Sequence, residues 1–152
     1  MIVGVISDTH GLLRPQAVEA LRGSTLILHA GDVGDPNVLE ELRTIAPTIA
    51  VRGNVDTSEW AKTLPMTEVV DVGALHLFML HNLADLDLDP EAAHFAAVIS
   101  GHTHRPHAEM RNGVLFLNPG SAGPRRFKLP VALARMTVVG ARLTHEIVEL
   151  DP

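Results

Sequence analysis

The run IVGVISDTH (residues 2–10) opens the chain with an apolar, β-branched segment that stops at a carboxylate and an imidazole. Ile2 to Ile6 predicts a strand buried on both faces, because it lacks polar alternation. The pattern recurs twice: a predicted strand from Thr25 to Leu28 precedes Gly31-Asp32, and one from Thr48 to Val51 precedes Gly53-Asn54. A polar side chain therefore follows the carboxyl end of each strand.

Two short helices are predicted between these strands. Pro15 to Leu21 is typical of the first, with Gly23 ending it. Pro36 begins the second, behind Asp35 as a candidate N-cap, and its apolar stripe consists of Val38, Leu39, Leu42 and Ile45. Alternating strands and helices indicate a parallel sheet in this half of the chain.

The second half of the chain favours antiparallel pairs. Glu68 to Val72 and Leu75 to Leu80 flank Gly73, and Asn112-Gly113 is a strong hairpin signal between two apolar runs. A long closing hairpin is expected over residues 131–150, and one helical segment over Pro90 to Phe95 before a strand at Ala97 to Ser100. We therefore expect a single domain, residues 1–152, with two sheets face to face and helices outside.

Composition and charge exclude several classes of protein. The chain has 152 residues, is 46% hydrophobic and carries a net charge of −6, which argues against disorder and against a nucleic-acid polymer as partner. No apolar run reaches the ~18 residues of a membrane span, and the N-terminus lacks the basic start of a signal peptide. Cysteine is absent, which removes disulfides and thiolate sites. A cytoplasmic protein is expected, and a homo-oligomer is left open.

Polar residues that follow five predicted strands form the candidate site. Strand ends of a parallel or mixed sheet meet at one edge, so side chains distant in sequence would converge there. Two carboxylates crowded with imidazoles repel one another and lose solvation, a conflict that divalent cations resolve. Oxygen and nitrogen ligands without sulfur suit transition metals better than calcium. The candidates are Asp8, His10, Asp32, Asn54, His81, His102 and His104.

The order of these motifs resembles the signature of the calcineurin-like metallophosphoesterases, in particular their small bacterial and archaeal phosphodiesterase branch. The motifs are Asp8-Thr9-His10, Gly31-Asp32, Gly53-Asn54, His81 and Gly101-His102-Thr103-His104, with Asn118-Pro119-Gly120-Ser121 as a late loop. The resemblance covers nearly the whole chain. It implies a four-layer α-β-β-α sandwich of two mixed sheets. It also implies that Asp8, His10 and His104 hold one metal, that Asn54, His81 and His102 hold the second, and that Asp32 bridges them.

The activity that the resemblance implies is hydrolysis of small phosphate diesters. A hydroxide bridging two divalent transition metals would be the nucleophile, because the metals lower its pKa towards ~7. Manganese is the first choice of metal, with nickel, iron, zinc or cobalt as alternatives. Asp32, Asn54 and His81 are the candidate catalytic residues. The alternatives are a phosphomonoesterase on the same site and a non-catalytic interaction scaffold of the same fold, although a scaffold is expected to have lost ligands.

Two positions depart from the pattern of the resembled branch. Val55 stands where a cysteine or, in monoesterases, a histidine is usual, and Asn82-Leu83 follows His81 where Gly-His is usual. Neither Val55 nor Leu83 can donate a proton. We therefore expect that no dedicated general acid serves the leaving group, so that aryl esters are favoured.

Several other side chains have two interpretations. His29 either orients a ligand or is a hydrogen-bonded core histidine, and Asp56 either orients Asn54 or caps the segment after it. His76 is expected to be half-buried packing. Arg125 and Arg126 either contact a phosphate or form a solvated pair, and Trp60 is either a buried anchor or part of an oligomer contact.

Overall fold

Ten strands form two five-stranded mixed sheets in the computed structural model, which describes residues 1–152. The first sheet has the order β10-β9-β1-β2-β3 and contains β1 (Ile2–Ile6), β2 (Leu26–His29), β3 (Thr48–Ala50), β9 (Ala132–Val139) and β10 (Arg142–Glu149). The second has the order β4-β5-β6-β8-β7 and contains β4 (Thr67–Val72), β5 (Leu75–Leu80), β6 (Ala97–Ile99), β7 (His107–Arg111) and β8 (Val114–Asn118).

Parallel and antiparallel pairing divide as the two halves of the sequence indicate. Strands β1, β2 and β3 are parallel, and the closing β9–β10 hairpin joins them antiparallel to β1. In the second sheet, β5, β6 and β8 are parallel, while β4 and β7 pair antiparallel with β5 and β8. The predicted mixed sheets are confirmed.

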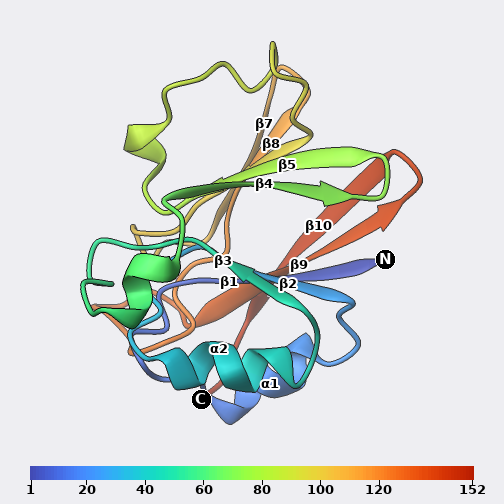
Figure 1. The fold of residues 1–152 in the computed structure, drawn as a ribbon. Helices are drawn as coiled ribbons and strands as arrows, with labels where there is room; N and C mark the ends of the chain where they lie inside the picture. The colour runs from blue at the N-terminus through green and yellow to red at the C-terminus, as the bar shows by residue number, and fades with distance from the viewer.

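Helices α1 (Pro15–Leu21) and α2 (Pro36–Arg43) cover the outer face of the first sheet (Figure 1). Both begin at a proline, and the Asp35 carboxylate caps α2 by accepting from Asn37 N at 2.8 Å. The outer face of the second sheet carries no α-helix. It is covered by the short 3₁₀ helix η2 (Leu83–Asp85) and the chain that follows, whose Leu83, Leu86, Leu88 and Phe95 pack on Phe78, Leu80 and Phe116.

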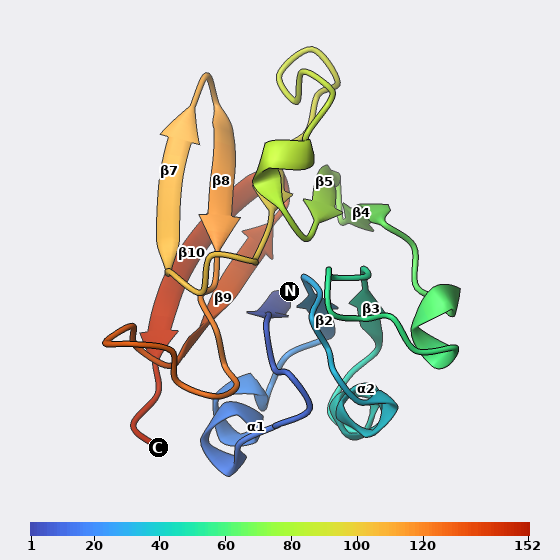
Figure 2. The same cartoon turned by 90° about the vertical axis from the view of Figure 1, so that its left-hand side faces the viewer.

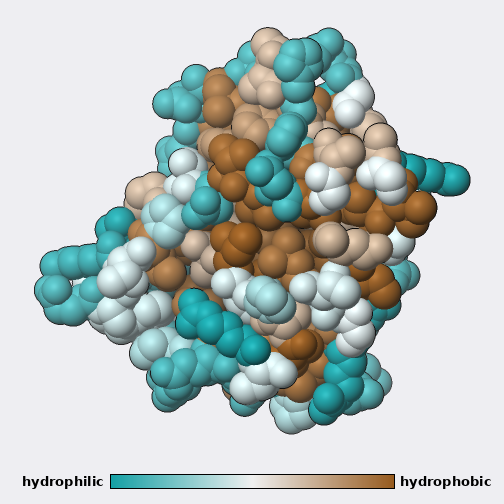
Figure 3. Space-filling model, turned by 45° about the vertical axis from the view of Figure 1, so that its right-hand side comes forward, coloured by the Kyte–Doolittle hydropathy of each residue, from teal (hydrophilic) through white to brown (hydrophobic).

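The main apolar core lies between the two sheets. Val5, Leu28, Met79 and Leu117 belong to it and are almost fully buried. A second core lies between the first sheet and the helices, where Trp60 of the 3₁₀ helix η1 (Trp60–Thr63) packs half-buried as an anchor. Figure 3 shows apolar side chains across the middle of one face, between the two layers. No helix has the length and apolar character that crossing a membrane requires.

The segment Pro90–Phe95 forms turns, and the prediction of a helix there is wrong. Asp89 Oδ1 accepts from Glu91 N at 3.0 Å, which starts one turn. His94 then adopts a φ of 62°, and that left-handed conformation ends the turn. One turn without continuation does not make a helix.

His76 is exposed, and the prediction of a half-buried packing role for it is also wrong. Its side chain shares an outward face with Phe78 and Leu80 but lies nearer the β4–β5 turn. Its Nδ1 lies 2.5 Å from Asp71 Oδ1 on the neighbouring strand, in an exposed pair.

Candidate metal centre

The first two strand ends are joined by their backbones. Asp8 N donates to Gly31 O at 3.0 Å, and His10 N donates to Asp32 O at 3.0 Å. These bonds continue the parallel β1–β2 pairing past the end of the strands, so both carboxylates lie at one edge of the sheet. Asp8 is fully buried and Asp32 is 3% exposed.

Backbone strain is concentrated at this edge. Positive φ angles occur at Asp8 (55°), His10 (46°), Asp32 (56°), His102 (72°) and His104 (63°), which are five of the seven candidate residues. Residues other than glycine rarely adopt this conformation, and it costs of order 1 kcal/mol or more at each position. The fold accepts this strain where side chains must converge on one point.

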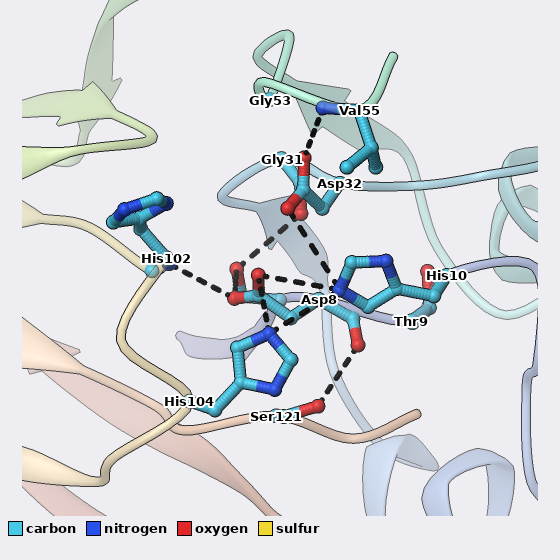
Figure 4. A network of polar contacts seen from close by, with 12 residues as sticks. Asp8, Thr9, His10, Gly31, Asp32, Gly53, Val55, His102, His104 and Ser121 are labelled. Atoms are coloured by element: carbon cyan, nitrogen blue, oxygen red, sulfur yellow. Dashed lines mark hydrogen bonds and ion pairs between the residues drawn. The ribbon is translucent and has the colours of Figure 1, made fainter. Parts of the chain in front are cut away.

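One group of donors forms around Asp8. His104 Nε2 lies 3.3 Å from Asp8 Oδ1, and His10 Nε2 lies 3.8 Å from the same oxygen and 3.3 Å from His104 Nε2. Figure 4 shows both imidazoles pointing towards the Asp8 carboxylate. These three residues come from the ends of β1 and from the segment after β6.

A second group of donors forms around His81. Its Nε2 lies 3.2 Å from Asp32 Oδ2 and 3.0 Å from Asn54 Oδ1. His102 Nδ1 lies 3.2 Å from the same Asn54 oxygen. Asp32 Oδ2 also lies 3.8 Å from His10 Nε2, so this oxygen faces an imidazole of each group. Asp8 Oδ1 lies 3.9 Å from His81 Nε2 and likewise faces both. The structure thus brings all seven candidate residues together.

The donor atoms are oriented as metal ligands would be. Ser7 Oγ and His102 N donate to Asp8 Oδ2 at 2.7 and 3.1 Å, while the buried Asp8 Oδ1 has no hydrogen-bond partner. His81 Nδ1 donates to Ala30 O at 2.7 Å, so in the neutral ring Nε2 carries the lone pair and can bind a metal. Ligand atoms ~2.1 Å from one metal lie about 3.0–3.4 Å apart, as His10 and His104 do. The residues therefore fit divalent cations.

Electrostatics keep one carboxylate ionised. Burial by itself would raise the pKa of Asp32, but a hydrogen bond from the protonated His81 ring and one from Val55 N, the latter 3.0 Å long, outweigh it and hold the pKa at about 2. Burial likewise would lower the pKa of His81, but its contacts with Asp32 and Asp8 raise it instead. Asp32 is thus a fixed negative charge at neutral pH.

Close backbone approach requires glycine at two positions. A Cβ on Gly53 would collide with the Asp32 carboxylate, and a Cβ on Gly101 would lie 2.6 Å from Asp8 Oδ2 and collide with Ser7 Oγ. The absence of a side chain lets the strand ends approach the carboxylates.

Asp56 has a role that neither interpretation of the sequence includes. It is 3% exposed and accepts from Val33 N, Gly34 N and Gly53 N at 3.2, 3.0 and 2.9 Å. One buried carboxylate therefore ties the loop after Asp32 to the loop before Asn54. A lone aspartate two residues after Asn54 gives no sequence signal for three backbone partners.

His29 is a hydrogen-bonded core histidine. Gly31 N donates to its Nδ1 at 3.1 Å, and its Nε2 lies 3.0 Å from Thr9 Oγ1. Burial lowers its pKa to about 4, which keeps the ring neutral. It supports the loops that carry Asp8 and Asp32 without facing either carboxylate at hydrogen-bond distance.

A small cleft lies beside the second group of donors. Arg52, Asn82 and Asp85 line it together with Asn54, His81 and His102. Arg52 supplies a guanidinium to this cleft and directly precedes Gly53-Asn54, a position that the sequence analysis did not single out. Val55 is 47% exposed, and Arg125 and Arg126 are exposed on a loop that does not line the cleft.

Comparison with known proteins is consistent with this geometry. The family model for the calcineurin-like phosphoesterase superfamily domain matches residues 1–140. The chain is 34% identical to a protein of Methanothermobacter thermautotrophicus named probable metallophosphoesterase, over 97% of this chain and 92% of that protein. It is 31% identical to the phosphodiesterase YfcE of Escherichia coli, over 76% of each chain.

A solved structure shows the same fold. Vps29 of Chaetomium thermophilum superposes with a TM-score of 0.84 and 24% identity, covering 98% of this chain and 88% of that one. Together with the matches in sequence, this likeness accounts for both mixed sheets and for nearly every element of the chain. The chain belongs to the calcineurin-like phosphoesterase superfamily, and it is a metal-dependent phosphoesterase.

Proposed function

We propose that this protein is a phosphodiesterase that hydrolyses small phosphate diesters with two divalent transition-metal ions. One observation carries the proposal: seven side chains from five strand ends meet with their oxygen and nitrogen donors 3.0–3.9 Å apart. Such a cluster of carboxylates and imidazoles is costly without cations. Manganese is the proposed metal, with nickel, iron, zinc and cobalt as alternatives.

The proposed ligand sets follow the two groups of donors. Asp8, His10 and His104 hold the first metal, and Asn54, His81 and His102 hold the second. Asp32 bridges them, a role supported by the position of its Oδ2, 3.2 Å from His81 Nε2 and 3.8 Å from His10 Nε2. When bound, the metal pair lowers the pKa of water and neutralises charge on the phosphate.

The residues of the chain orient the reactants. Ala30 O fixes the His81 tautomer, and Val55 N and His81 hold Asp32 in its ionised form. Arg52 Nε donates to Leu64 O at 3.2 Å, which anchors the guanidinium while its other N–H groups are free to bind a phosphate oxygen. These contacts fix the orientation and charge of the protein groups before the substrate binds, so that they already face the position of its phosphorus atom.

Diesters are preferred to monoesters because of Val55. This side chain cannot supply a proton to a leaving group or a cation to a doubly charged monoester. Departure of the leaving group then depends on its own stability as an anion, which favours aryl esters.

The test is hydrolysis of bis-p-nitrophenyl phosphate against p-nitrophenyl phosphate after chelation and addition of manganese, nickel or zinc. Faster turnover of the diester, restored by metal, is expected. Dominant turnover of the monoester would identify a phosphomonoesterase instead. Stoichiometric metal binding without turnover of either ester would identify a scaffold, the alternative that the retained donor set argues against.

A further inference from the structure

The cleft beside the second group of donors is smaller than most ligand pockets. Its volume is about 140 Å³, while ligand pockets generally have ~300–1,000 Å³. A phosphate held there with a bulky substituent directs that substituent beyond the cleft.

A larger pocket adjoins the cleft. It has a volume of about 380 Å³ and lies between η2 and the β7–β8 hairpin. Figure 2 shows the β7–β8 hairpin towards the viewer, with the yellow-green segment that contains η2 beside it. Asn82 lines both spaces, and Gly101 and Thr103, which line the larger pocket, flank His102 in the cleft. The two spaces are therefore neighbours across one loop.

The pocket combines an apolar floor with hydrogen-bond donors. Phe116, Leu117 and Leu83 supply the floor. Asn82 Oδ1 accepts from Ala84 N at 3.0 Å, which leaves the amide N–H₂ as its free end. The guanidinium groups of Arg105 and Arg111 also line the pocket and can only donate.

The two arginines differ in charge balance. Arg111 lies 2.9 Å from Glu109 Oε2 and stacks 4.7 Å above the Phe116 ring centroid, so its charge is already neutralised. The Arg105 side chain makes no hydrogen bond or ion pair; only its backbone N–H donates, to Thr103 Oγ1 at 3.2 Å. Arg105 is thus an unbalanced cation beside a pocket that also offers the free Asn82 amide N–H₂ as a donor.

We propose that this pocket binds an anionic group, a carboxylate or a phosphate, carried by the substituent that stays on the phosphorus, and that Arg105 is its specificity-determining residue. The inference rests on the proposed function, since it places the reacting phosphate in the cleft. The natural substrate is then a diester with a second negative charge on one arm.

A second hollow offers a competing direction. It lies on the other side of Asn54, and Lys62 and Arg52 line it. Lys62 Nζ is paired with Glu59 Oε1 at 2.8 Å, and Arg52 is the cation assigned above to the reacting phosphate, so neither is left for a second anion. Only Met66 contributes an apolar wall. Lys62 therefore gives a matched control.

The experiment uses p-nitrophenyl diesters whose second arm is 4-carboxybenzyl, 4-phosphonobenzyl or the neutral 4-carbamoylbenzyl group. The ratio of kcat/KM for each charged ester to that for the neutral ester is measured within each variant. We expect a ratio of about tenfold in the wild type, a ratio near one in Arg105→Gln, and a partly restored ratio in Arg105→Lys. Lys62→Gln should retain the wild-type ratio.

Binding is measured separately from turnover. The 4-carboxybenzyl and 4-carbamoylbenzyl esters of methylphosphonate are titrated into metal-free protein, and the ring resonances of Phe116 are followed by NMR. Tighter binding of the carboxylate ester that is lost in Arg105→Gln supports the anion-binding pocket. It does so even if no diester is hydrolysed, because the absence of hydrolysis would contradict only the proposed function. A ratio near one in the wild type, or equal loss in Lys62→Gln, would overturn the inference. The carboxylate and phosphonate arms distinguish the two anions.

Discussion

Mild acid should destabilise this protein through His29, a side chain outside the donor cluster. The ring is fully buried, and burial lowers its pKa from 6.5 to about 4 despite the nearby charges of Asp8 and Asp56. In the unfolded chain the same ring takes up a proton near pH 6.5. Between these values the unfolded state binds a proton that the folded state does not, so stability must fall as the pH falls.

The magnitude follows from the two pKa values. Each pH unit within the window costs up to about 1.4 kcal/mol, so that roughly 3 kcal/mol is lost between pH 7 and pH 4. Asp32, with its pKa lowered to about 2, loses its contribution only below pH ~4. His81 has a raised pKa, so its contribution is present below pH ~6.5 and is lost as the pH rises through its folded value. Neither group therefore lowers the free energy of unfolding between pH 6 and 4.

The measurement is urea unfolding of chelator-treated protein at half-unit steps from pH 7 to 4. His29→Asn should be less stable than wild type at pH 7 but should lose much less on acidification. His145→Gln, which alters an exposed histidine on β10, should keep the wild-type slope. A wild-type free energy of unfolding that stays flat between pH 6 and 4 would contradict the assignment of a neutral buried ring.

Three further results are expected. Asp32→Asn should reduce metal occupancy, measured by elemental analysis, and lower kcat/KM more than about 100-fold, since losing even a residue that only hydrogen-bonds to a metal ligand typically lowers metal affinity or activity about 10–100-fold. Equal effects of Asp32→Asn and His145→Ala would refute the bridging role. Asp56→Ala should lower the free energy of unfolding by about 3 kcal/mol, because three backbone N–H groups, two of them buried, lose their acceptor; a urea midpoint like that of the exposed Asp87→Ala would refute this. Nitrophenyl diesters should be hydrolysed much faster than dialkyl diesters, and equal rates would show that a general acid exists.

Local signals in the sequence predicted most elements correctly. Pro36 behind Asp35 marked the start of α2, and Asn112-Gly113 marked the turn between β7 and β8. Each signal depends on backbone geometry within a few residues, and these local preferences do not depend on the rest of the fold. The segment Pro90–Phe95 was mispredicted because one turn of suitable residues does not outweigh the left-handed conformation at His94.

Burial was harder to predict for single polar residues. His76 lies in an apolar run, yet the chain that covers the outer face of its sheet does not shield it, and it reaches solvent. Asp56 lies in a polar run, yet backbone N–H groups of two other loops surround it. In both cases the neighbours come from distant segments, so residue type alone could not decide the environment.

The order of strand-end motifs by itself predicted the family, the two mixed sheets and the seven side chains that the fold brings together, because each motif is a short pattern at the end of one strand. Only the tertiary structure decided which donors face each other, that Asp56 and His29 hold the loops, and that an unpaired Arg105 lines a pocket beside His102. Those relations depend on contacts such as His102 N to Asp8 Oδ2, between residues 94 positions apart. No pattern along the chain encodes such distances; they arise when two separate sheets pack against one another.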